Sequence, residues 1–166
     1  MCVKFVAGRD GADALYTEAV HELYLASFER ARQRLEKLPP QLLPEIARQL
    51  PDETFFMYVY QGPRVVAFSV CVVGGATYHG LYAGIDHELN SVYDLYFNMF
   101  YHVVDHALKQ GVTTLALGQT ADTFKRHKLA CNQVPLYSYV KGANPLCLSV
   151  VRGRQVRTTV HTRAPP

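Results

Sequence analysis

The sequence lacks the long apolar segments that mark membrane-spanning or exported proteins. Its apolar runs are interrupted well short of the ~20 residues that a membrane-spanning helix needs. Residues 1–6 contain no extended apolar segment of the kind found in secretory signal peptides. We therefore expect a cytoplasmic protein without a membrane span.

The sequence is also poor in cysteine, with four residues that lie far apart. No two of them form a Cys-x-x-Cys pair, which argues against a zinc knuckle and a thioredoxin-type redox motif. Cys71 and Cys147 lie within apolar runs, where cysteine acts as a small core residue.

The motifs of several common enzyme classes are missing. There is no Gly-x-Ser-x-Gly elbow, no Gly-x-Gly-x-x-Gly after an expected strand, and no P-loop glycine before Lys125. His102 and His106 stand one helical turn apart, but the glutamate of a His-Glu-x-x-His zinc motif is absent. Both belong to the polar stripe of an expected helix, so we expect them to face solvent and predict no metal site.

Acidic residues are absent from residues 151–166, which hold four arginines. Without these four, the chain has 13 basic residues against 14 acidic ones, so the net charge of +3 comes from this segment. The near-neutral remainder argues against a nucleic-acid binder, which usually has a basic face on the domain itself. We expect residues 152–166 to form a basic tail that is either flexible or adds an edge strand.

The remaining sequence is that of one folded domain. With 166 residues, of which 49% are hydrophobic and 19% charged, the chain is long enough to bury a core and is not disordered. We assign residues 1–151 to a single domain.

The first half of the chain predicts a short strand, two helices and a meander of strands. Residues 2–7 alternate weakly as a strand, and apolar residues recur at near-helical spacing over 12–38, before Pro39-Pro40. A shorter helix is expected over 41–50. The segments that favour strands, separated by Gly-Pro and Gly-Gly turns, are 54–61, 65–73 and 76–85.

The second half alternates helices and strands. The predicted elements are a helix over 91–110 that ends at Gly111, a strand over 112–117, a helix over 121–130, and strands over 134–141 and 146–151. The order is β-α-α-β-β-β-α-β-α-β-β. A helix between two long strands implies one parallel crossover, so we predict an α/β (α+β) fold with a mixed, mostly antiparallel sheet of about 6–7 strands and about four helices.

This element order over residues 1–151 resembles the fold of the GNAT acyltransferases. The stretch 91–125, with Gly111, the Gly118-Gln119-Thr120 loop and the pair Phe124-Lys125, is similar to the Fem-like branch of that superfamily, which includes peptidoglycan aminoacyltransferases. The resemblance implies direct transfer of an acyl or aminoacyl group to an amine, carried by a small molecule or a peptide. It also implies a splayed parallel strand pair that holds the donor.

The resemblance assigns most of the donor-binding residues. The splayed edge would lie at Gly84-Ile85-Asp86, the phosphate-binding helix start at Asn90-Ser91-Val92, and the donor carbonyl near Gly118, Gln119 and Thr120 with Phe124 beside it. The expected donor is an acyl-CoA. However, residues 86–93 contain no glycine, whereas the superfamily has a glycine-containing pyrophosphate loop at this point. Two alternatives follow: an aminoacyl-tRNA donor, or a non-catalytic module that binds a ligand or a partner protein.

Three residues are candidates for the chemistry. The resemblance places Lys125 at the oxyanion, although it also lies in a basic run, 125–128, that is typical of a solvated helix face. Asp86 and His79 are candidate bases. An Asp at the position of Asp86 usually caps the following helix, and a histidine such as His79 is more often a half-buried strand residue. Strict alternation would place Tyr82 on the face of Tyr78, opposite His79.

The sequence leaves the oligomeric state open. Some of its aromatic residues fit either a homodimer interface or the core, namely Tyr58, Tyr60, Tyr96 and Tyr101.

Overall fold

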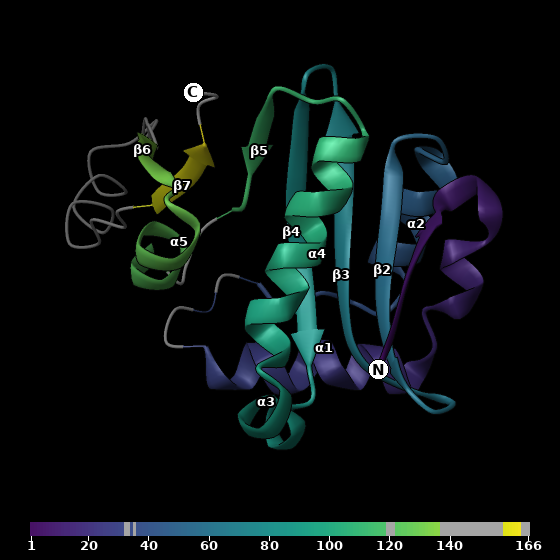
Figure 1. The fold of residues 1–166 in the computed structure, drawn as a ribbon. Helices are drawn as coiled ribbons and strands as arrows, with labels where there is room; N and C mark the ends of the chain where they lie inside the picture. Colours follow the sequence, from purple (N-terminus) through teal and green to yellow (C-terminus); the bar gives the residue numbers. More distant parts are fainter. Residues whose placement is uncertain (32–33, 35, 119–121, 137–157, 164–166) are drawn as a thin grey trace, which may run out of the picture.

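The structure, a computed structural model, describes residues 1–31, 34, 36–118, 122–136 and 158–163. They form a seven-stranded sheet with the strand order β1-β2-β3-β4-β5-β7-β6 (Figure 1). The strands are β1 (Cys2–Ala7), β2 (Thr54–Gln61), β3 (Arg64–Gly74), β4 (Thr77–Ile85), β5 (Thr114–Ala116), β6 (Asn132–Leu136) and β7 (Thr158–Arg163). The pairing of β4 with β5 is parallel, and the other pairings are antiparallel, which confirms the predicted mixed sheet with one parallel crossover.

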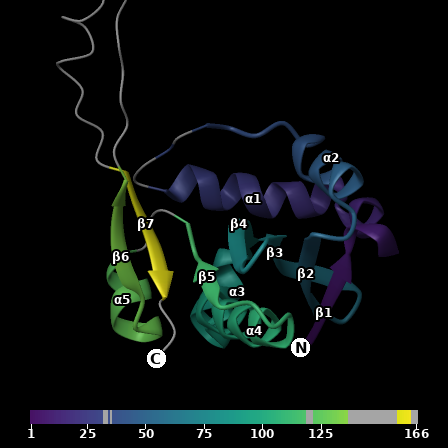
Figure 2. The same cartoon turned by 90° about the horizontal axis from the view of Figure 1, so that it is seen from above.

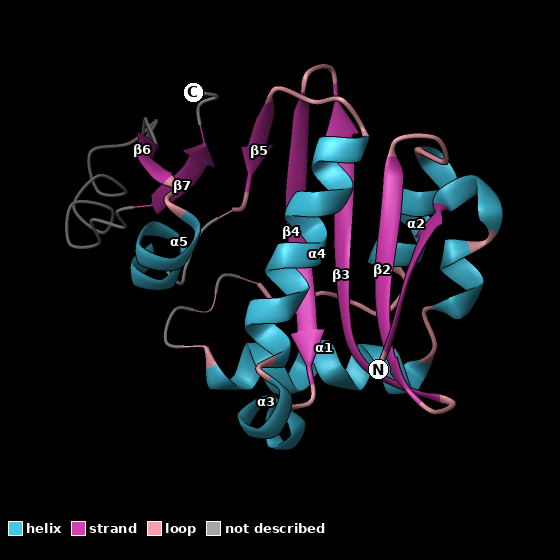
Figure 3. Ribbon diagram, in the orientation of Figure 1, coloured by secondary structure: helices cyan, strands magenta, loops and turns pink. Residues whose placement is uncertain are grey.

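Helices cover both faces of this sheet. They are α1 (Glu18–Arg30), α2 (Leu42–Gln49), α3 (His87–Tyr93), α4 (Leu95–Lys109) and α5 (Asp122–Leu129), with 3-10 turns at Gly8–Asp10 and Ala12–Leu15. Seen from above, α1 and α2 lie on one face, and α3 and α4 lie on the other (Figure 2). The secondary-structure colouring shows α4 running along β3 and β4, with α5 beside β6 (Figure 3).

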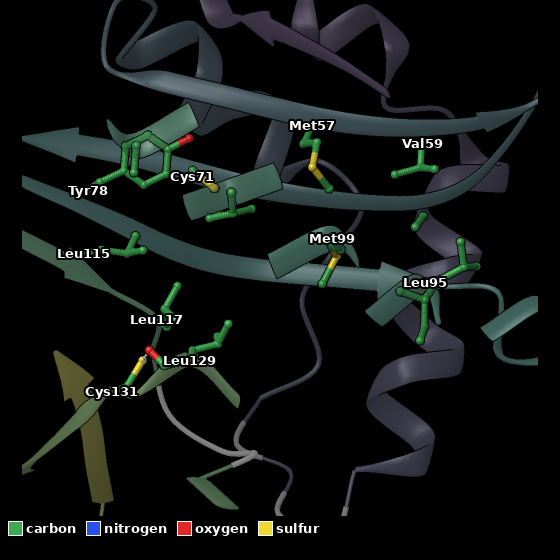
Figure 4. Close-up of a cluster of buried hydrophobic side chains, with 14 of the residues drawn as sticks. Met57, Val59, Cys71, Tyr78, Leu95, Met99, Leu115, Leu117, Leu129 and Cys131 are labelled. Carbon is green, nitrogen blue, oxygen red and sulfur yellow. Dashed lines mark hydrogen bonds between the residues drawn. The ribbon is translucent and has the colours of Figure 1, made fainter. Parts of the chain in front are cut away.

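Two buried clusters stabilise the two faces. On the α4 face, Met99, Val103 and Leu95 pack against β2–β4, and Leu117, Leu129 and Cys131 extend this cluster toward α5 (Figure 4). On the other face, α1 and α2 pack on aromatic residues of β2 and β3, among them Phe56, Tyr58 and Phe68. Burying side chains of this size contributes about 1.5–3 kcal/mol each, so the meander of β2–β4 is the centre of the fold.

The single helix predicted over 12–38 is wrong in its extent. The helix α1 spans Glu18–Arg30, and Ala31 already has an extended ψ of 131°. Leu38 fits the helical spacing of apolar residues because its side chain is buried, but it belongs to an irregular segment. The Tyr24 hydroxyl donates to the Glu36 carbonyl at 3.1 Å and accepts from the Leu38 amide at 3.1 Å, which ties this segment back to α1.

The helix predicted over 91–110 is also divided. Asp94, with φ 47°, lies in the left-handed region and separates α3 from α4. Two asparagines cap the break: Asn90 Oδ1 accepts from the Tyr96 amide at 2.8 Å, and Asn98 Nδ2 donates to the Tyr93 carbonyl at 2.9 Å. The apolar pattern runs through this break, so periodicity alone does not reveal it.

His106 does not face solvent, contrary to the prediction. Its ring stacks on Phe5 at 4.0 Å between centroids, and its Nδ1 lies 2.7 Å from the Tyr78 hydroxyl. Burial, with a smaller effect of Lys109, lowers the pKa of His106. His102 is exposed, as predicted.

One of the last two strands comes from the segment 152–166, which was predicted to be a basic tail. β6 begins at Asn132, two residues before the predicted strand 134–141, and the structure describes it to Leu136. β7 comes from the basic segment 152–166 and pairs with both β5 and β6, so it lies inside the described sheet rather than at its edge. The predicted strand 146–151, with Cys147, lies outside the described residues.

Other predictions concern single residues. Cys71 is buried in the core, as predicted. Tyr58 is buried and donates to the Ala12 carbonyl at 2.9 Å, whereas Tyr101 is 49% exposed. Among the described residues, no helix is both long enough and apolar enough to cross a bilayer.

We predict that Gly84→Ala destabilises the fold. A Cβ at Gly84 would lie 2.5 Å from the Leu23 carbonyl carbon and 2.6 Å from the Tyr24 amide nitrogen, both on the backbone of α1. The helix would have to move away from β4, which costs about 1–3 kcal/mol. Urea denaturation measures this loss. Gly74→Ala is the matched control, because its Cβ would meet only the His79 ring at 3.7 Å; equal losses in both variants would contradict the prediction.

We also predict that His106 makes the fold sensitive to acid. Its pKa is lowered in the folded state, so below about pH 6.5 the unfolded chain takes up a proton there before the folded chain does. The free energy of unfolding should therefore fall as the pH drops, and fall less steeply in His106→Gln. His102→Gln, on the same helix, should keep the wild-type slope. Denaturation curves at several pH values test this, and an unchanged slope in His106→Gln would refute it.

Candidate functional site

The parallel strands β4 and β5 part soon after they begin to pair. Their register runs from Thr77 opposite Thr114 to His79 opposite Ala116. β4 continues to Ile85, whereas the chain after β5 turns away at Gly118, where φ is 67°. A Cβ at Gly118 would also lie 3.3 Å from the Gly80 carbonyl oxygen, so glycine suits this turn for two reasons. The splayed pair is confirmed, but its free edge begins at Gly80 rather than at Gly84.

A cavity of about 570 Å³ lies where the strands part. One half is formed by α4 and the adjoining strands and is mainly apolar; it includes Tyr96, Met99, Phe100 and Val103. Burial raises the pKa of Tyr96 to about 12, which keeps this phenol neutral. The other half is formed by α1 and its surroundings and is more polar; it includes Tyr24, Ser27, Arg30 and His87. The cavity therefore passes from one face of the sheet toward the other, with the edge of β4 between its two halves.

Lys125 lies at the wall of this cavity and is only 2% exposed. Its ammonium donates to the Leu117 carbonyl at 2.6 Å and to the Gly118 carbonyl at 3.2 Å. Its Nζ also lies 6.0 Å from the centre of the Phe100 ring. The interpretation as a solvated lysine is therefore wrong, although Arg126, His127 and Lys128 are exposed, as a solvated helix face would be. Lys125 joins α5 to the turn at which β5 leaves β4.

Phe124 packs beside Lys125 on the aromatic side of α4. Its ring lies 5.2–5.7 Å from those of Tyr96, Phe97 and Phe100. It supports the cavity wall from behind and does not fill the cavity. Of the predicted loop, Gly118 lines the cavity, while Gln119 and Thr120 lie outside the described residues.

Asp86 caps a helix, as the alternative interpretation held. Its Oδ1 accepts from the amides of Glu88 and Leu89 at 3.0 and 3.1 Å, and its Oδ2 lies 2.7 Å from Arg64 Nη2. Its carboxylate is therefore engaged by one cation and two backbone donors. Asp86 is not among the residues that line the cavity.

His79 is exposed and lies outside the cavity lining. A bulge between Val70 and Cys71 in the pairing of β3 with β4 places Tyr82 opposite Val70 and Gly80 opposite Cys71. Strict alternation therefore fails at Leu81, and Tyr82 lies on the α1 face, where its ring meets that of Tyr24 edge-on at 6.2 Å. The prediction that Tyr82 shares a face with Tyr78 is wrong for this reason.

The predicted helix start at Asn90-Ser91-Val92 is wrong, because α3 begins at His87 and these three residues lie within it. Asn90 caps α4, Ser91 donates to the Glu88 carbonyl at 2.8 Å, and Val92 is 69% exposed. None of the three lines the cavity. Ile85 does line it, and its backbone amide donates to Ser27 Oγ at 3.2 Å.

Sequence reasoning missed Ser27 and His87. Ser27 Oγ lies 3.3 Å from His87 Nε2, and both residues line the polar half of the cavity. The two are far apart in the sequence and neither belongs to a spacing motif. The sequence holds no signal that pairs them, because the contact depends on the crossing of α1 over the end of β4.

The fold and the parted strands define the class of the protein. The mixed sheet, its single parallel crossover and the cavity between the parting strands are the features of an acyltransferase of the GNAT type, as the resemblance implied. The chain belongs to this family: the model of the acetyltransferase (GNAT) domain matches residues 2–126.

Solved structures show the same fold. They include the ribosomal-protein-alanine N-acetyltransferase of Brucella melitensis (TM-score 0.64, 10% identity, 99% of this chain and 100% of that one). The ribosomal-protein-S18-alanine N-acetyltransferase of Escherichia coli also matches (0.58, 13%, 97% and 91%). So does the PaiA N-acetyltransferase of Thermoplasma acidophilum in complex with coenzyme A (0.54, 10%, 99% and 100%). No significant match to the sequence of a curated protein was found.

We predict that Lys125→Met destabilises the protein. Methionine keeps most of the apolar stem but leaves the carbonyls of Leu117 and Gly118 without the ammonium, which costs about 1.5–3 kcal/mol. Urea denaturation measures the loss. Lys128→Met, an exposed position on the same helix, should change stability by less than about 0.5 kcal/mol. If the two variants are equally stable, Lys125 does not hold the turn.

Proposed function

We propose that this protein transfers an acyl group from a thioester donor to an amine by direct transfer, without a covalent enzyme intermediate. The observation that carries the proposal is the parting of β4 and β5, which opens a cavity along the free edge of β4. Direct transfer requires both substrates at once, and a cavity reaching from one face of the sheet to the other admits them from opposite sides. Membership of the acetyltransferase (GNAT) family supports this chemistry.

The free edge of β4 suits the amide-bearing arm of an acyl donor. Over residues 80–84 the strand has no neighbouring strand on its β5 side among the described residues, so its backbone can pair with an extended ligand as with an added strand. The bulge at Leu81 leaves backbone groups out of the regular ladder, next to the cavity. Backbone amides of this kind are suited to stabilise the oxygen of the reacting carbonyl.

We propose a second role for Lys125 beyond its structural contacts. Its buried charge lies in the cavity wall, where it favours the negative charge that develops on the carbonyl oxygen. Its contacts with Leu117 and Gly118 also position the turn that forms the β5 side of the cavity. His79 and Asp86 lie outside the cavity lining, so we do not propose either as the base.

We propose an acyl-CoA as the donor, supported by the family match and by the fold shared with a coenzyme A-bound N-acetyltransferase. The residues present fit the arm of this donor better than its phosphates. The short helix α3 lies where the superfamily has its glycine loop. The Tyr96 amide at the start of α4 already donates to the Asn90 side chain and is not available to a phosphate. The resemblance to the Fem-like branch keeps aminoacyl-tRNA as the alternative donor. The acceptor would be an amine of a small molecule or a peptide.

The same feature favours a second candidate function. Because α3 carries Glu88, and its N-cap is Asp86, where donor phosphates would lie, the protein could be a GNAT-fold module that binds a ligand or a partner protein without catalysis. The experiment below distinguishes donor binding from its absence, and turnover of an amine distinguishes an enzyme from a module.

We predict that acetyl-CoA or a longer acyl-CoA raises the melting temperature of the wild-type protein. A ligand that binds only the folded state stabilises it by about 2.7 kcal/mol at a concentration of 100 Kd. Ala83→Leu, which places a larger side chain in the cavity, should abolish the rise. Ala76→Leu, at an exposed position in the turn between β3 and β4, should not.

A thermal-shift titration with free CoA, acetyl-CoA and longer acyl-CoAs tests this directly. If no acyl-CoA raises the melting temperature at millimolar concentration, the CoA-dependent form of the proposal is refuted. An equal rise in wild type and Ala83→Leu would place the ligand outside this cavity.

A further inference from the structure

The polar half of the cavity contains a hydroxyl and an imidazole in hydrogen-bonding contact. Ser27 Oγ lies 3.3 Å from His87 Nε2, and both side chains line the cavity. Ser27 comes from the last turns of α1, and His87 is the first residue of α3, directly after β4. The cavity therefore brings together two groups that chemistry commonly uses as a pair.

A backbone hydrogen bond accepted by Ser27 leaves the serine proton free to be donated to His87. The Ile85 amide donates to Ser27 Oγ at 3.2 Å, so the serine oxygen accepts there and its own proton is available for His87. A serine that donates to His87 Nε2 requires this nitrogen to be unprotonated, with the proton of the neutral ring on Nδ1. Ser27 is thus held at a strand residue that itself lines the cavity.

The surroundings favour a neutral imidazole. Burial lowers the pKa of His87, and the charge of Arg30 on α1 lowers it further. Asp86 acts in the opposite direction, but its carboxylate is paired with Arg64. Other charged groups that line the cavity are Arg34, Glu36 and Lys125. His87 is therefore in its basic form at neutral pH, which a proton acceptor requires.

The division of the cavity indicates which substrate meets this pair. The α4 half is apolar and suits the acyl group and the arm of the donor. The α1 half carries charged and hydroxyl groups. These can replace the hydrogen bonds to water that a polar amine loses when it enters the cavity. The acceptor amine therefore belongs on the side of Ser27 and His87.

We propose that Ser27 and His87 form a proton relay that deprotonates the acceptor amine during acyl transfer. This inference rests on the proposed function. The amine nitrogen forms a bond to the acyl carbon while the carbon–sulfur bond breaks and the thiolate leaves. The amine gives one proton to Ser27 Oγ as Ser27 gives its own to His87 Nε2. The imidazolium later returns this proton to the thiolate or to water.

The test compares His87→Gln and Ser27→Ala with His102→Gln, which changes an exposed histidine on α4 outside the cavity. The donor is acetyl-CoA, and the acceptors are free amino acids, a short peptide with a free N-terminus and an alkyl diamine. We expect kcat/KM to fall about 100-fold or more in His87→Gln, mainly through kcat, and to stay unchanged in His102→Gln. In His87→Gln, the contribution of the His87 ring to the acid limb of the profile of kcat/KM against pH should be lost, and only the ionisation of the acceptor amine should remain.

A second measurement keeps the inference separate from the proposed function. A titration of the His87 ring by nuclear magnetic resonance should show a pKa below the ordinary histidine value and a proton on Nδ1, and the preference for Nδ1 should weaken in Ser27→Ala. A His87 ring that is protonated at neutral pH would overturn the relay, whatever the activity. Equal activity and equal pH profiles in wild type and His87→Gln would also overturn it. If acetyl-CoA neither binds nor acylates any of these amines while the His87 ring titrates as expected, the proposed function fails instead.

Discussion

The parting of β4 from β5 is the constraint on which the rest of this molecule depends. Three cross-strand pairs hold the parallel strands together, from Thr77 with Thr114 to His79 with Ala116, and then the chain leaves at Gly118. A strand edge left open in this way costs backbone hydrogen bonds unless a ligand or side chains satisfy them. Lys125 offsets part of this cost, because its ammonium donates hydrogen bonds to the carbonyls of Leu117 and Gly118. Removing the Lys125 ammonium from water, to 2% exposure, itself costs free energy. The fold therefore holds the turn at this point at the expense of that desolvation.

The opening matters for function because it joins two chemically different environments. On one side, α4 provides aromatic and aliphatic walls; on the other, α1 provides hydroxyl and guanidinium groups, and His87 at the start of α3 provides an imidazole. Gly84 allows α1 to approach β4 closely enough to bring Ser27 to the strand, where the Ile85 amide orients it. The same close approach thus serves both the core and the candidate chemistry. Such a meeting of an apolar and a polar environment suits the proposed acyl transfer.

The sequence predicted the meander, the parallel crossover and the buried helix face, because these depend on local periodicity and on turn residues such as Gly62 and Gly75. It did not predict the features that depend on long-range contact. The position of Leu38 fitted a helical pattern because its side chain is buried, although the residue lies in an irregular segment. Asp94 breaks a continuous apolar pattern without glycine or proline, and the bulge at Leu81 reverses the alternation that placed Tyr82. Within the candidate site, the family pattern pointed to Lys125, whereas the pairing of Ser27 with His87 needed the structure.

The position of β7 has a consequence for folding during synthesis on the ribosome. β5 ends at Ala116, yet its second neighbour in the sheet is Thr158–Arg163, which the ribosome adds more than forty residues later. Until then the nascent chain exposes one edge of β5, and such an edge is a template for pairing with other chains. The sheet on this side of β5 is therefore completed only after Thr158–Arg163 has been made. During synthesis, β7 has to reach this edge before a neighbouring chain does.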